Sequence, residues 1–103
     1  MSLAEPDSPW LRVANLQPSL LAQVSVRRIE HRGERWYVLS NDAAGVHHRI
    51  NDVAWEFAGR LDGKTTVQDA WVAVGKLRGD LAMTQAEALQ LILQLEQREL
   101  LQA

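Results

Sequence analysis

The side chains best suited to chemistry in this chain are three histidines, His31, His47 and His48. Imidazole nitrogens bind metal ions and transfer protons near neutral pH. Two of the three are adjacent in a segment that favours a strand, so their side chains point to opposite faces and cannot readily chelate one ion. The chain has no cysteine and no HExxH motif, which removes the usual supporting ligands. We expect no metal site and no cofactor.

The run Gly63-Lys64-Thr65 has only a superficial likeness to a phosphate-binding P-loop. The P-loop motif needs a first glycine where this chain has Ala58, and it follows a strand, whereas this run follows a helical pattern. A turn between helices is the better interpretation. The serines lack a histidine and aspartate context, and no paired carboxylates stand out. We therefore expect no catalytic residue in this segment.

The composition indicates one domain without a strong electrostatic preference. The chain has 103 residues, of which 47% are hydrophobic and 23% charged, with a net charge of -2. These values are ordinary for a globular domain, and they give no electrostatic footprint for nucleic acid or an anionic membrane. The N-terminus has no signal-peptide pattern, and no apolar run approaches the length of a membrane span. We expect a cytoplasmic chain without direct membrane insertion.

The elements that position these side chains begin with three short strands. Val24–Glu30 alternates weakly, Arg35–Ser40 is rich in Trp, Tyr and Val, and Val46–Ile50 follows the turn residues of segment 41–45. Segment 31–34 supplies the other turn. Strands linked this tightly predict an antiparallel meander.

The hydrophobic period changes at Asn51, where a helical pattern begins. Apolar residues recur at helical spacing in Asp52–Leu61, with Asn51 as the N-cap and Asp62-Gly63 as the stop. Thr66 is the predicted N-cap of a second helix, whose apolar stripe extends from Val67 to Val74.

The third helix begins at a predicted capping box, Thr84 with Glu87, and has a surplus of apolar surface. Its apolar arc spans roughly 200°, against the stripe of about 100° that covers a core. One flank should face the core, while the other packs on the sheet or lines a groove. We expect Leu89 and Leu93 to line the groove, with Leu91 and Leu95 as the alternative. The predicted fold is α+β, in the order β-β-β-α-α-α.

The tryptophans indicate how the chain closes on itself. Trp10 is expected to hold a partly ordered N-terminal arm, residues 1–17, against a domain formed by residues 18–103. A domain of this size has few aromatic side chains, and we expect those at the core or its edge to be Trp36, Trp55 and Trp71.

Taken together, these segments resemble PqqD-like domains, also called RiPP recognition elements. The resemblance covers Pro18–Leu101 and is carried by RWYVLSNDAAGVHHRIN, DGKTTV, DAW and TQAEALQLILQLEQRELL. It is most similar to the N-terminal copy in membrane-embedded zinc metalloproteases of the site-2-protease type. The resemblance implies a winged-helix-like domain, with a three-stranded antiparallel sheet followed by a three-helix bundle. It also implies no chemistry of its own, although a parent protein could be a zinc metallopeptidase.

The resemblance further implies a binding mode for an extended, leader-like peptide. Such a peptide adds as a strand beside the third strand and against the third helix. The corresponding positions are Val46, His47, His48, Arg49 and Ile50 on the strand and Leu89 and Leu93 on the helix. An edge strand offers main-chain hydrogen bonds for affinity, and pockets for alternate side chains give selectivity. The expected partner is a peptide or a domain of a parent protein.

Two hypotheses from other classes remain open. Winged helices often bind DNA, but the third helix carries one basic residue, Arg98, against Glu87, Glu96 and Glu99. Such a helix would repel the phosphate backbone, so we expect no nucleic-acid partner. The other hypothesis is a purely structural, intramolecular domain of a membrane metallopeptidase.

The first hairpin carries a cluster of four arginines, Arg27, Arg28, Arg32 and Arg35. An ordinary solvated face is the favoured interpretation of this cluster, and an acidic partner is the weaker one.

Overall fold

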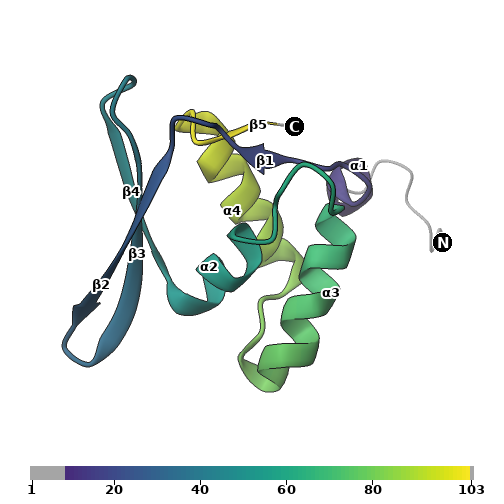
Figure 1. The fold of residues 1–103 in the computed structure, drawn as a ribbon. Helices are drawn as coiled ribbons and strands as arrows, with labels where there is room; N and C mark the ends of the chain where they lie inside the picture. The colour runs from purple at the N-terminus through teal and green to yellow at the C-terminus, as the bar shows by residue number, and fades with distance from the viewer. Residues whose placement is uncertain (1–8, 103) are drawn as a thin grey trace, which may run out of the picture.

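The computed structural model describes residues 9–102, which form an α+β fold with a three-stranded antiparallel sheet on one side and helices on the other (Figure 1). The predicted α+β class and the three-stranded antiparallel meander are therefore confirmed. Short elements that the sequence did not predict occur before the sheet, before the last helix and at the C-terminus. The elements are α1 (Pro9–Val13), β1 (Ser19–Leu20), β2 (Ser25–His31), β3 (Glu34–Asn41), β4 (Val46–Asn51), α2 (Asp52–Ala58), α3 (Val67–Arg78), the 3₁₀ turn η1 (Gly79–Leu81), α4 (Gln85–Gln97) and β5 (Leu101–Gln102).

The sheet has the order β2-β3-β4, so β4 lies at an edge. A two-residue turn joins β2 to β3, and its residues Arg32 and Gly33 both have positive φ angles, 54° and 80°. Positive φ at both central positions is typical of a type I′ turn, whose twist suits a tight hairpin. The strand boundaries fall within one residue of the predicted ones.

Side-chain caps begin the three longer helices, as predicted. Asn51 Oδ1 accepts the N–H three residues on at 2.8 Å, and Thr66 Oγ1 does the same at 3.1 Å. Thr84 and Glu87 form the reciprocal capping box, with bonds of 2.8 Å and 3.1 Å. Each cap satisfies a backbone donor that the first helical turn leaves without a partner.

Helix α2 ends at Ala58, three residues earlier than predicted. Its last turn tightens, because the Arg60 N–H bonds to the Phe57 carbonyl and the Leu61 N–H to the Ala58 carbonyl, both at 3.1 Å. This tightening carries Leu61 into the core, where it is buried. The helical spacing of Leu61 thus reflects burial in a turn and not a longer helix.

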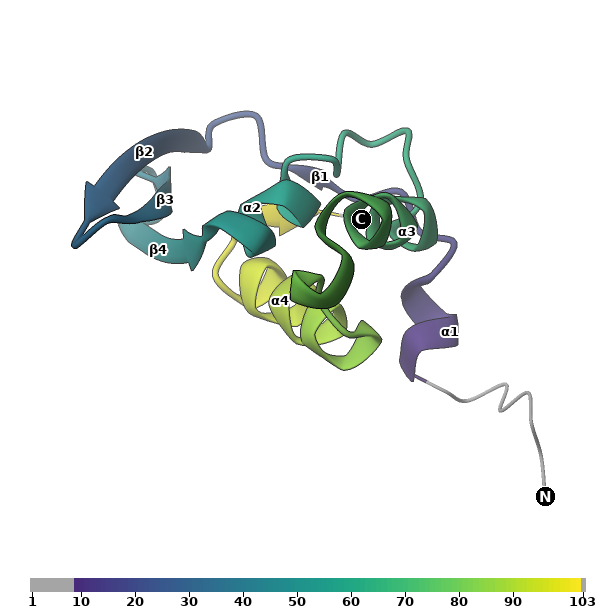
Figure 2. The same cartoon turned by 90° about the horizontal axis from the view of Figure 1, so that it is seen from below.

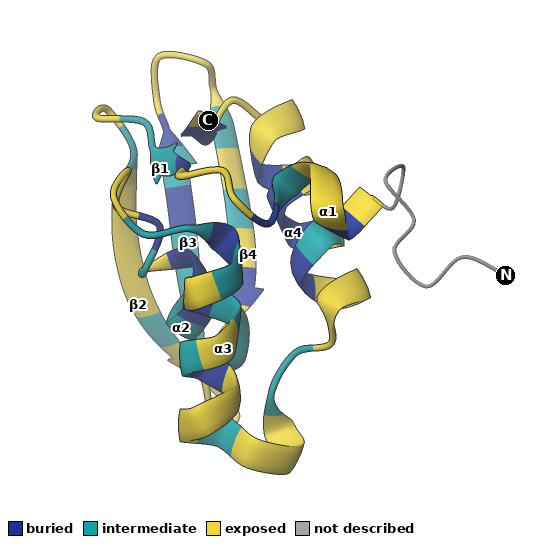
Figure 3. Ribbon diagram, turned by 90° about the vertical axis from the view of Figure 1, so that its right-hand side faces the viewer, coloured by how far each residue is buried: buried dark blue, intermediate teal, exposed yellow. Residues whose placement is uncertain are grey.

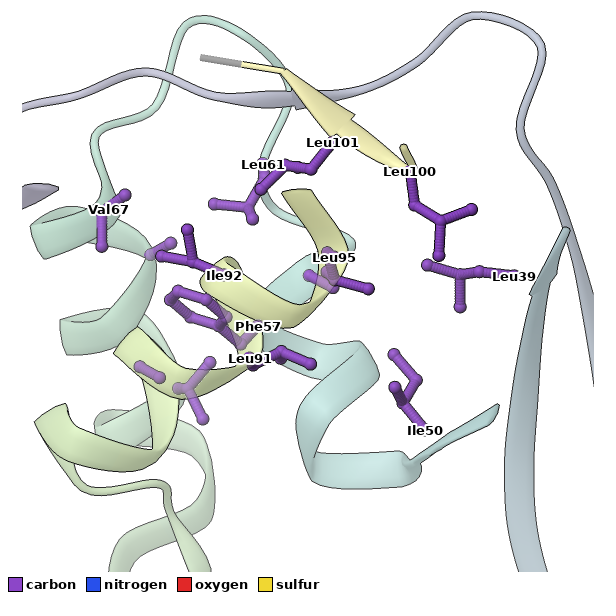
Figure 4. Close-up of a cluster of buried hydrophobic side chains, with 14 of the residues drawn as sticks. Leu39, Ile50, Phe57, Leu61, Val67, Leu91, Ile92, Leu95, Leu100 and Leu101 are labelled. Atoms are coloured by element: carbon purple, nitrogen blue, oxygen red, sulfur yellow. The ribbon is translucent and has the colours of Figure 1, made fainter. Parts of the chain in front are cut away.

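The core fills the space between the sheet and helices α2, α3 and α4 (Figures 2 and 4). Leu39 of β3, Phe57 of α2 and Leu95 of α4 are fully buried at its centre. Leu100 closes the core next to Leu39, and the following residue, Leu101, pairs with Leu20 in the short β1–β5 ladder. Residues 101 and 102 are thereby held beside β1, which precedes the three-stranded sheet in the sequence.

Trp10 packs into the same core, as expected of a residue that holds the N-terminal arm. Its indole N–H donates to Gln68 Oε1 at 2.9 Å, and its ring meets Trp71 edge-on with centroids 5.5 Å apart. Trp71 in turn donates to the Met83 carbonyl at 2.8 Å. Residues 1–8 of the predicted arm lie outside the described residues.

The prediction that Trp36 lies at the core or its edge is wrong, since this side chain lies on the face of the sheet opposite the core. Its neighbours Tyr37 and Leu39 face the helices, and Tyr37 stacks on Trp55 with ring centroids 5.2 Å apart. Trp55 and Trp71 are half-buried at the core edge, as predicted.

Within residues 9–102, no helix has the length and apolar character needed to cross a membrane.

Candidate functional site

Strand β4 combines an unpaired edge with helix α4 near both of its ends. In the described part of the chain β4 pairs with β3 alone, so its other edge has no strand beside it. Figure 3 shows β4 at the side of the sheet nearest to α4. Asn51 at the end of β4 lines a pocket with Glu87 near the start of α4, and His48 lies within electrostatic reach of Arg98 at the C-cap, so the helix and the strand run in opposite directions.

Asn41 holds one end of this arrangement together. It is the buried polar side chain of the described core, and its Nδ2 donates to the Glu99 carbonyl at 2.8 Å. Its Oδ1 accepts the Ala44 N–H, at 3.3 Å, in the turn that leads into β4. Glu99 follows the C-cap of α4 with a φ of 60°, the left-handed conformation of many helix ends. One side chain thus fixes the end of α4 against the start of β4.

His48 continues the contact between strand and helix. It is the register partner of the fully buried Leu39, so it lies on the face of the sheet that meets the helices. Partial burial lowers the pKa of His48 below its ordinary value, and the positive charge of Arg98 lowers it further. Protonated His48 is therefore disfavoured beside the C-terminal end of α4.

The opposite end of β4 lies at the N-terminal end of α4. A shallow pocket of about 200 Å³ is lined there by Asn51, the last residue of β4, and by Glu87. Its apolar wall consists of Val53, Ala54, Leu81, Ala82 and Met83. A second open pocket of about 320 Å³ adjoins Asn41 and Glu99 at the first end. Concave surface therefore exists at both ends of the strand, and both pockets combine polar and apolar residues.

The phase of α4 shows which of its residues lie beside β4. Glu87 and Arg98 both lie near β4, and at about 100° per residue they are about 20° apart around the helix. Leu91 and Gln94 complete this stripe at helical spacing. We call β4 together with Glu87, Leu91, Gln94 and Arg98 the β4–α4 site.

Leu89 and Leu93 point away from the β4–α4 site. Helical geometry places Leu89 about 160–180° and Leu93 about 120–140° from the stripe of Glu87 and Arg98. Leu89 is half-buried against the core, and Leu93 is 45% exposed. The structure does not bring these two predicted site residues to β4. The alternative pair divides: Leu91 lies in the stripe, while Leu95 is fully buried.

The five predicted strand residues alternate between the two faces of the sheet. Val46, His48 and Ile50 point toward the helices, and Ile50 is 5% exposed, so its side chain belongs to the core. His47 and Arg49 point to the opposite face. His47 Nδ1 lies 2.8 Å from Ser40 Oγ, and Arg49 stacks over Trp36. A ligand at this edge would therefore contact the side chains of Val46 and His48 on one face and of His47 and Arg49 on the other.

The Gly63-Lys64-Thr65 run forms a turn built around Asp62. Its carboxylate accepts the Lys64 and Thr65 N–H groups, each at 2.9 Å, and these hydrogen bonds, the Lys64 one foremost, lower the pKa of Asp62. The donors that would cradle a phosphate are thus already bonded within the turn. Among residues 9–102, no group of three or more His, Asp or Glu side chains is arranged to hold a metal ion.

Sequence patterns did not reveal Asn41, Gln94 or Arg98 as parts of the site. Asn41 occurs in a turn, where asparagine is common for local reasons, so its long-range bond to Glu99 left no pattern. Gln94 and Arg98 belong to the polar side of an amphipathic helix, and periodicity alone does not distinguish solvent from a neighbouring strand edge.

Comparison of the chain with protein-family models, with curated proteins and with solved structures finds no match.

Proposed function

We propose that this chain is a non-catalytic recognition domain, which binds an extended peptide by adding it as a strand to β4, in front of helix α4. The observation that carries the proposal is the unpaired edge of β4, with helix α4 near both ends of the strand. An open edge presents main-chain donors and acceptors in a row, and these bind a peptide largely independently of its sequence. Selectivity comes from the side chains that line the edge.

The two ends of the β4–α4 site favour different ligand side chains. The pocket near Asn51 combines apolar residues of α2 and of segment 81–83 with Asn51 and the Glu87 carboxylate, so it suits a side chain with an apolar stem and a hydrogen-bond donor. At the other end His48 and Arg98 favour an acidic or hydrogen-bond-accepting side chain, because both offer N–H donors. The proposal therefore includes a direction of binding, set by Glu87 at one end of the site and Arg98 at the other.

The likeness to PqqD-like domains supports the same proposal. In that family an extended leader peptide lies between the third strand of the sheet and the last helix, which correspond here to β4 and α4. A winged-helix-like arrangement of sheet and helices, within a larger peptide-processing protein, is part of the proposal. The described fold departs from the simple β-β-β-α-α-α order through α1, β1, η1 and β5.

Linear peptides selected by display against the immobilised protein provide a direct probe. Each selected peptide is titrated into isotope-labelled protein while amide shifts and hydrogen exchange are recorded by NMR. Strand addition should shift β4 amides and slow the exchange of the outward-facing ones. Changes confined to β2 or to the far side of α4 would contradict the proposal.

Proline substitutions then distinguish edge pairing from other contacts. Adjacent residues of an edge strand direct their N–H groups alternately to the neighbouring strand and to the open edge. Of the variants His47→Pro and His48→Pro, one therefore keeps the β3–β4 ladder, and that folded variant should lose peptide affinity by about tenfold or more. The matched pair on the other edge, Arg27→Pro and Arg28→Pro, supplies a folded control that should bind normally.

The two alternative functions predict different outcomes of the same experiments. Saturable, salt-dependent binding of duplex DNA without any peptide binding would favour a winged-helix DNA-binding regulator. Absence of saturable binding by every selected peptide, together with association with the remainder of a parent polypeptide, would favour a structural, intramolecular domain.

A further inference from the structure

The face of the sheet that points away from the helices is a second exposed surface of this molecule (Figure 1). Leu39 on β3 and Ile50 on β4 are buried against the helices. Adjacent residues of a strand point to opposite faces, so the neighbours of Leu39 and Ile50 along each strand point to the outer face. The centre of this outer face consists of Arg27 and Ile29 from β2, Trp36 and Val38 from β3, and His47 and Arg49 from β4.

Two arginines lie on either side of Val38 on this face. Arg27 and Arg49 are both register partners of Val38, one on each neighbouring strand. Strands are about 4.8 Å apart, so the two Cα atoms are separated by about 10 Å. Both side chains are exposed, and within residues 9–102 neither makes an ion pair with a carboxylate. The outer face therefore presents two neighbouring guanidinium groups whose charges the described residues do not neutralise.

Trp36 holds the Arg49 guanidinium in place in the absence of a ligand. The Arg49 guanidinium carbon lies 4.8 Å from the centroid of the Trp36 ring, a cation–π arrangement. A stacked guanidinium keeps its planar donors free for a carboxylate and loses less rotamer freedom on pairing than a mobile one. Trp36, Val38 and Ile29 are half-buried and provide an apolar floor beside the charges. The surface is thus both basic and partly preorganised.

The charge of the outer face contrasts with that of the chain, which is net acidic at -2. Within the part of the chain that the structure describes, Glu34 lies on this face at the hairpin end, and Glu30 and Asp52 join it in lining a hollow of about 410 Å³ next to Trp36. The basic part of the face is therefore the part around Val38, where Arg27 and Arg49 lie. Guanidinium groups bind carboxylates and phosphates alike. A nucleic acid is the less suitable ligand, because the face has two arginines, whereas affinity for a nucleic-acid backbone depends on many phosphate contacts.

The register also divides the arginine cluster of the first hairpin. Arg28 and Arg35 alternate with Arg27 and Trp36, so they lie on the other face of the sheet, and Arg32 lies in the turn. The cluster seen in the sequence is therefore not one surface. The pair that shares a face, Arg27 with Arg49, comes from strands that the sequence separates.

We propose that the outer face binds an acidic peptide segment, whose carboxylates pair with Arg27 and Arg49 on either side of Val38, beside the Trp36 ring. This surface does not depend on strand addition at β4, because it uses side chains on a face and not main-chain groups at an edge. It gives the molecule two recognition surfaces that share strand β4.

The test uses a fluorescein-labelled oligoglutamate peptide, with an oligoglutamine peptide of the same length and an oligothymidylate as comparison probes. Fluorescence anisotropy should show saturable binding of oligoglutamate that weakens with salt, and the Trp36 indole signal should shift in NMR spectra. Arg27→Glu and Arg49→Glu should each weaken binding about threefold to tenfold. Arg35→Glu reverses the same charge on the other face and should change affinity by less than about twofold.

Four outcomes would overturn the proposal. Equal losses in all three variants would indicate non-specific attraction. Equal binding of oligoglutamine would remove the role of carboxylates, and tighter binding of oligothymidylate would indicate a nucleic-acid surface. A loss in Arg49→Glu with none in Arg27→Glu would assign the peptide to the edge of β4. Circular dichroism on each variant shows that the fold is retained, as expected for exposed positions.

Discussion

Helix α4 has two flanks that differ in composition and in what lies beside them. The flank next to β4 carries Glu87, Gln94 and Arg98, with Leu91 buried at its base. The opposite flank carries Leu89, which packs against the core, and Leu93, which is 45% exposed. The apolar flank is thus partly open to solvent, whereas the polar flank lies on the side of an open strand edge. A surplus of apolar residues on a helix therefore does not by itself indicate which flank faces a binding site.

The polar composition of the flank next to β4 also bears on how the edge of this strand stays accessible to a ligand. An apolar helix flank beside an open edge would tend to collapse onto it, since burial of apolar surface is favourable at about 25 cal/mol per Å². Polar side chains keep their water and leave the edge accessible. The polar stripe is thus compatible with a binding role for β4, and it does not depend on the leucines that the sequence suggested.

The largest expected effect concerns Leu95, which lies between the two flanks on the buried face of α4. Its side chain is fully buried, so Leu95→Ala should lower the free energy of unfolding by about 2–5 kcal/mol through lost burial and a residual cavity. Leu93→Ala on the exposed flank is the matched control, and it should change stability by less than about 1 kcal/mol. Urea denaturation measures both. Similar losses in the two variants would mean that α4 docks with a different face toward the core.

The second prediction concerns Asn41, whose substitution should affect the β4 flank of α4 and not the opposite flank. Asn41→Ala removes a buried side chain together with its bond to the Glu99 carbonyl, which should cost about 1–3 kcal/mol of stability. Hydrogen exchange should accelerate at residues 98–100 and in the turn before β4, while the amides that hold α1 keep their protection. Asn15→Ala, at an exposed position, is the control and should stay within about 0.5 kcal/mol of the parent protein. Uniformly faster exchange over both flanks would show that Asn41 acts on the whole fold.

A steric change tests which flank a bound peptide meets. Gln94→Trp adds a large ring beside β4 and should weaken a display-selected peptide by about tenfold, equivalent to about 1.4 kcal/mol. Leu93→Trp adds a ring to the opposite flank of the same helix and should leave the affinity unchanged. Both positions are exposed, so stability should change little in either variant. Isothermal titration calorimetry gives the two affinities, and the reverse ranking would return Leu93 to the site as the sequence suggested.

Local patterns in the sequence predicted most of the longer elements. The caps at Asn51, Thr66 and Thr84 act within one helical turn, so their partners are close in the sequence and recognisable there. The β1–β5 ladder could not be predicted, because it joins two-residue strands from opposite ends of the chain. Helix α1 has five residues, too few for a hydrophobic period.

The site was harder to predict than the fold. The sequence indicated β4 as an edge strand, but the rotation of α4 against it depends on long-range packing of its buried residues, such as Leu91 and Leu95, together with the bond from Asn41 to Glu99. Trp36 shows a similar limit. Trp36, Tyr37, Val38 and Leu39 are all apolar, so this strand has no polar alternation to indicate which residues face the core.

The smallest effect is a pH dependence on the β4 side of α4. Burial and the charge of Arg98 hold the pKa of His48 below its ordinary value of 6.5, so the folded protein binds this proton less readily than the unfolded chain does. The stability associated with neutral His48 is therefore fully present above pH 6.5, and it is lost as the pH falls from there through the lowered pKa. Unfolding free energies measured by denaturation between about pH 8 and pH 5 should show this decline. His48→Gln should remove the part of this decline that comes from protonation of His48. Arg98→Gln should reduce the decline but leave part of it, because burial still disfavours the protonated ring. An unchanged decline in His48→Gln would assign the pH dependence to other groups and remove His48 from the contact between β4 and α4.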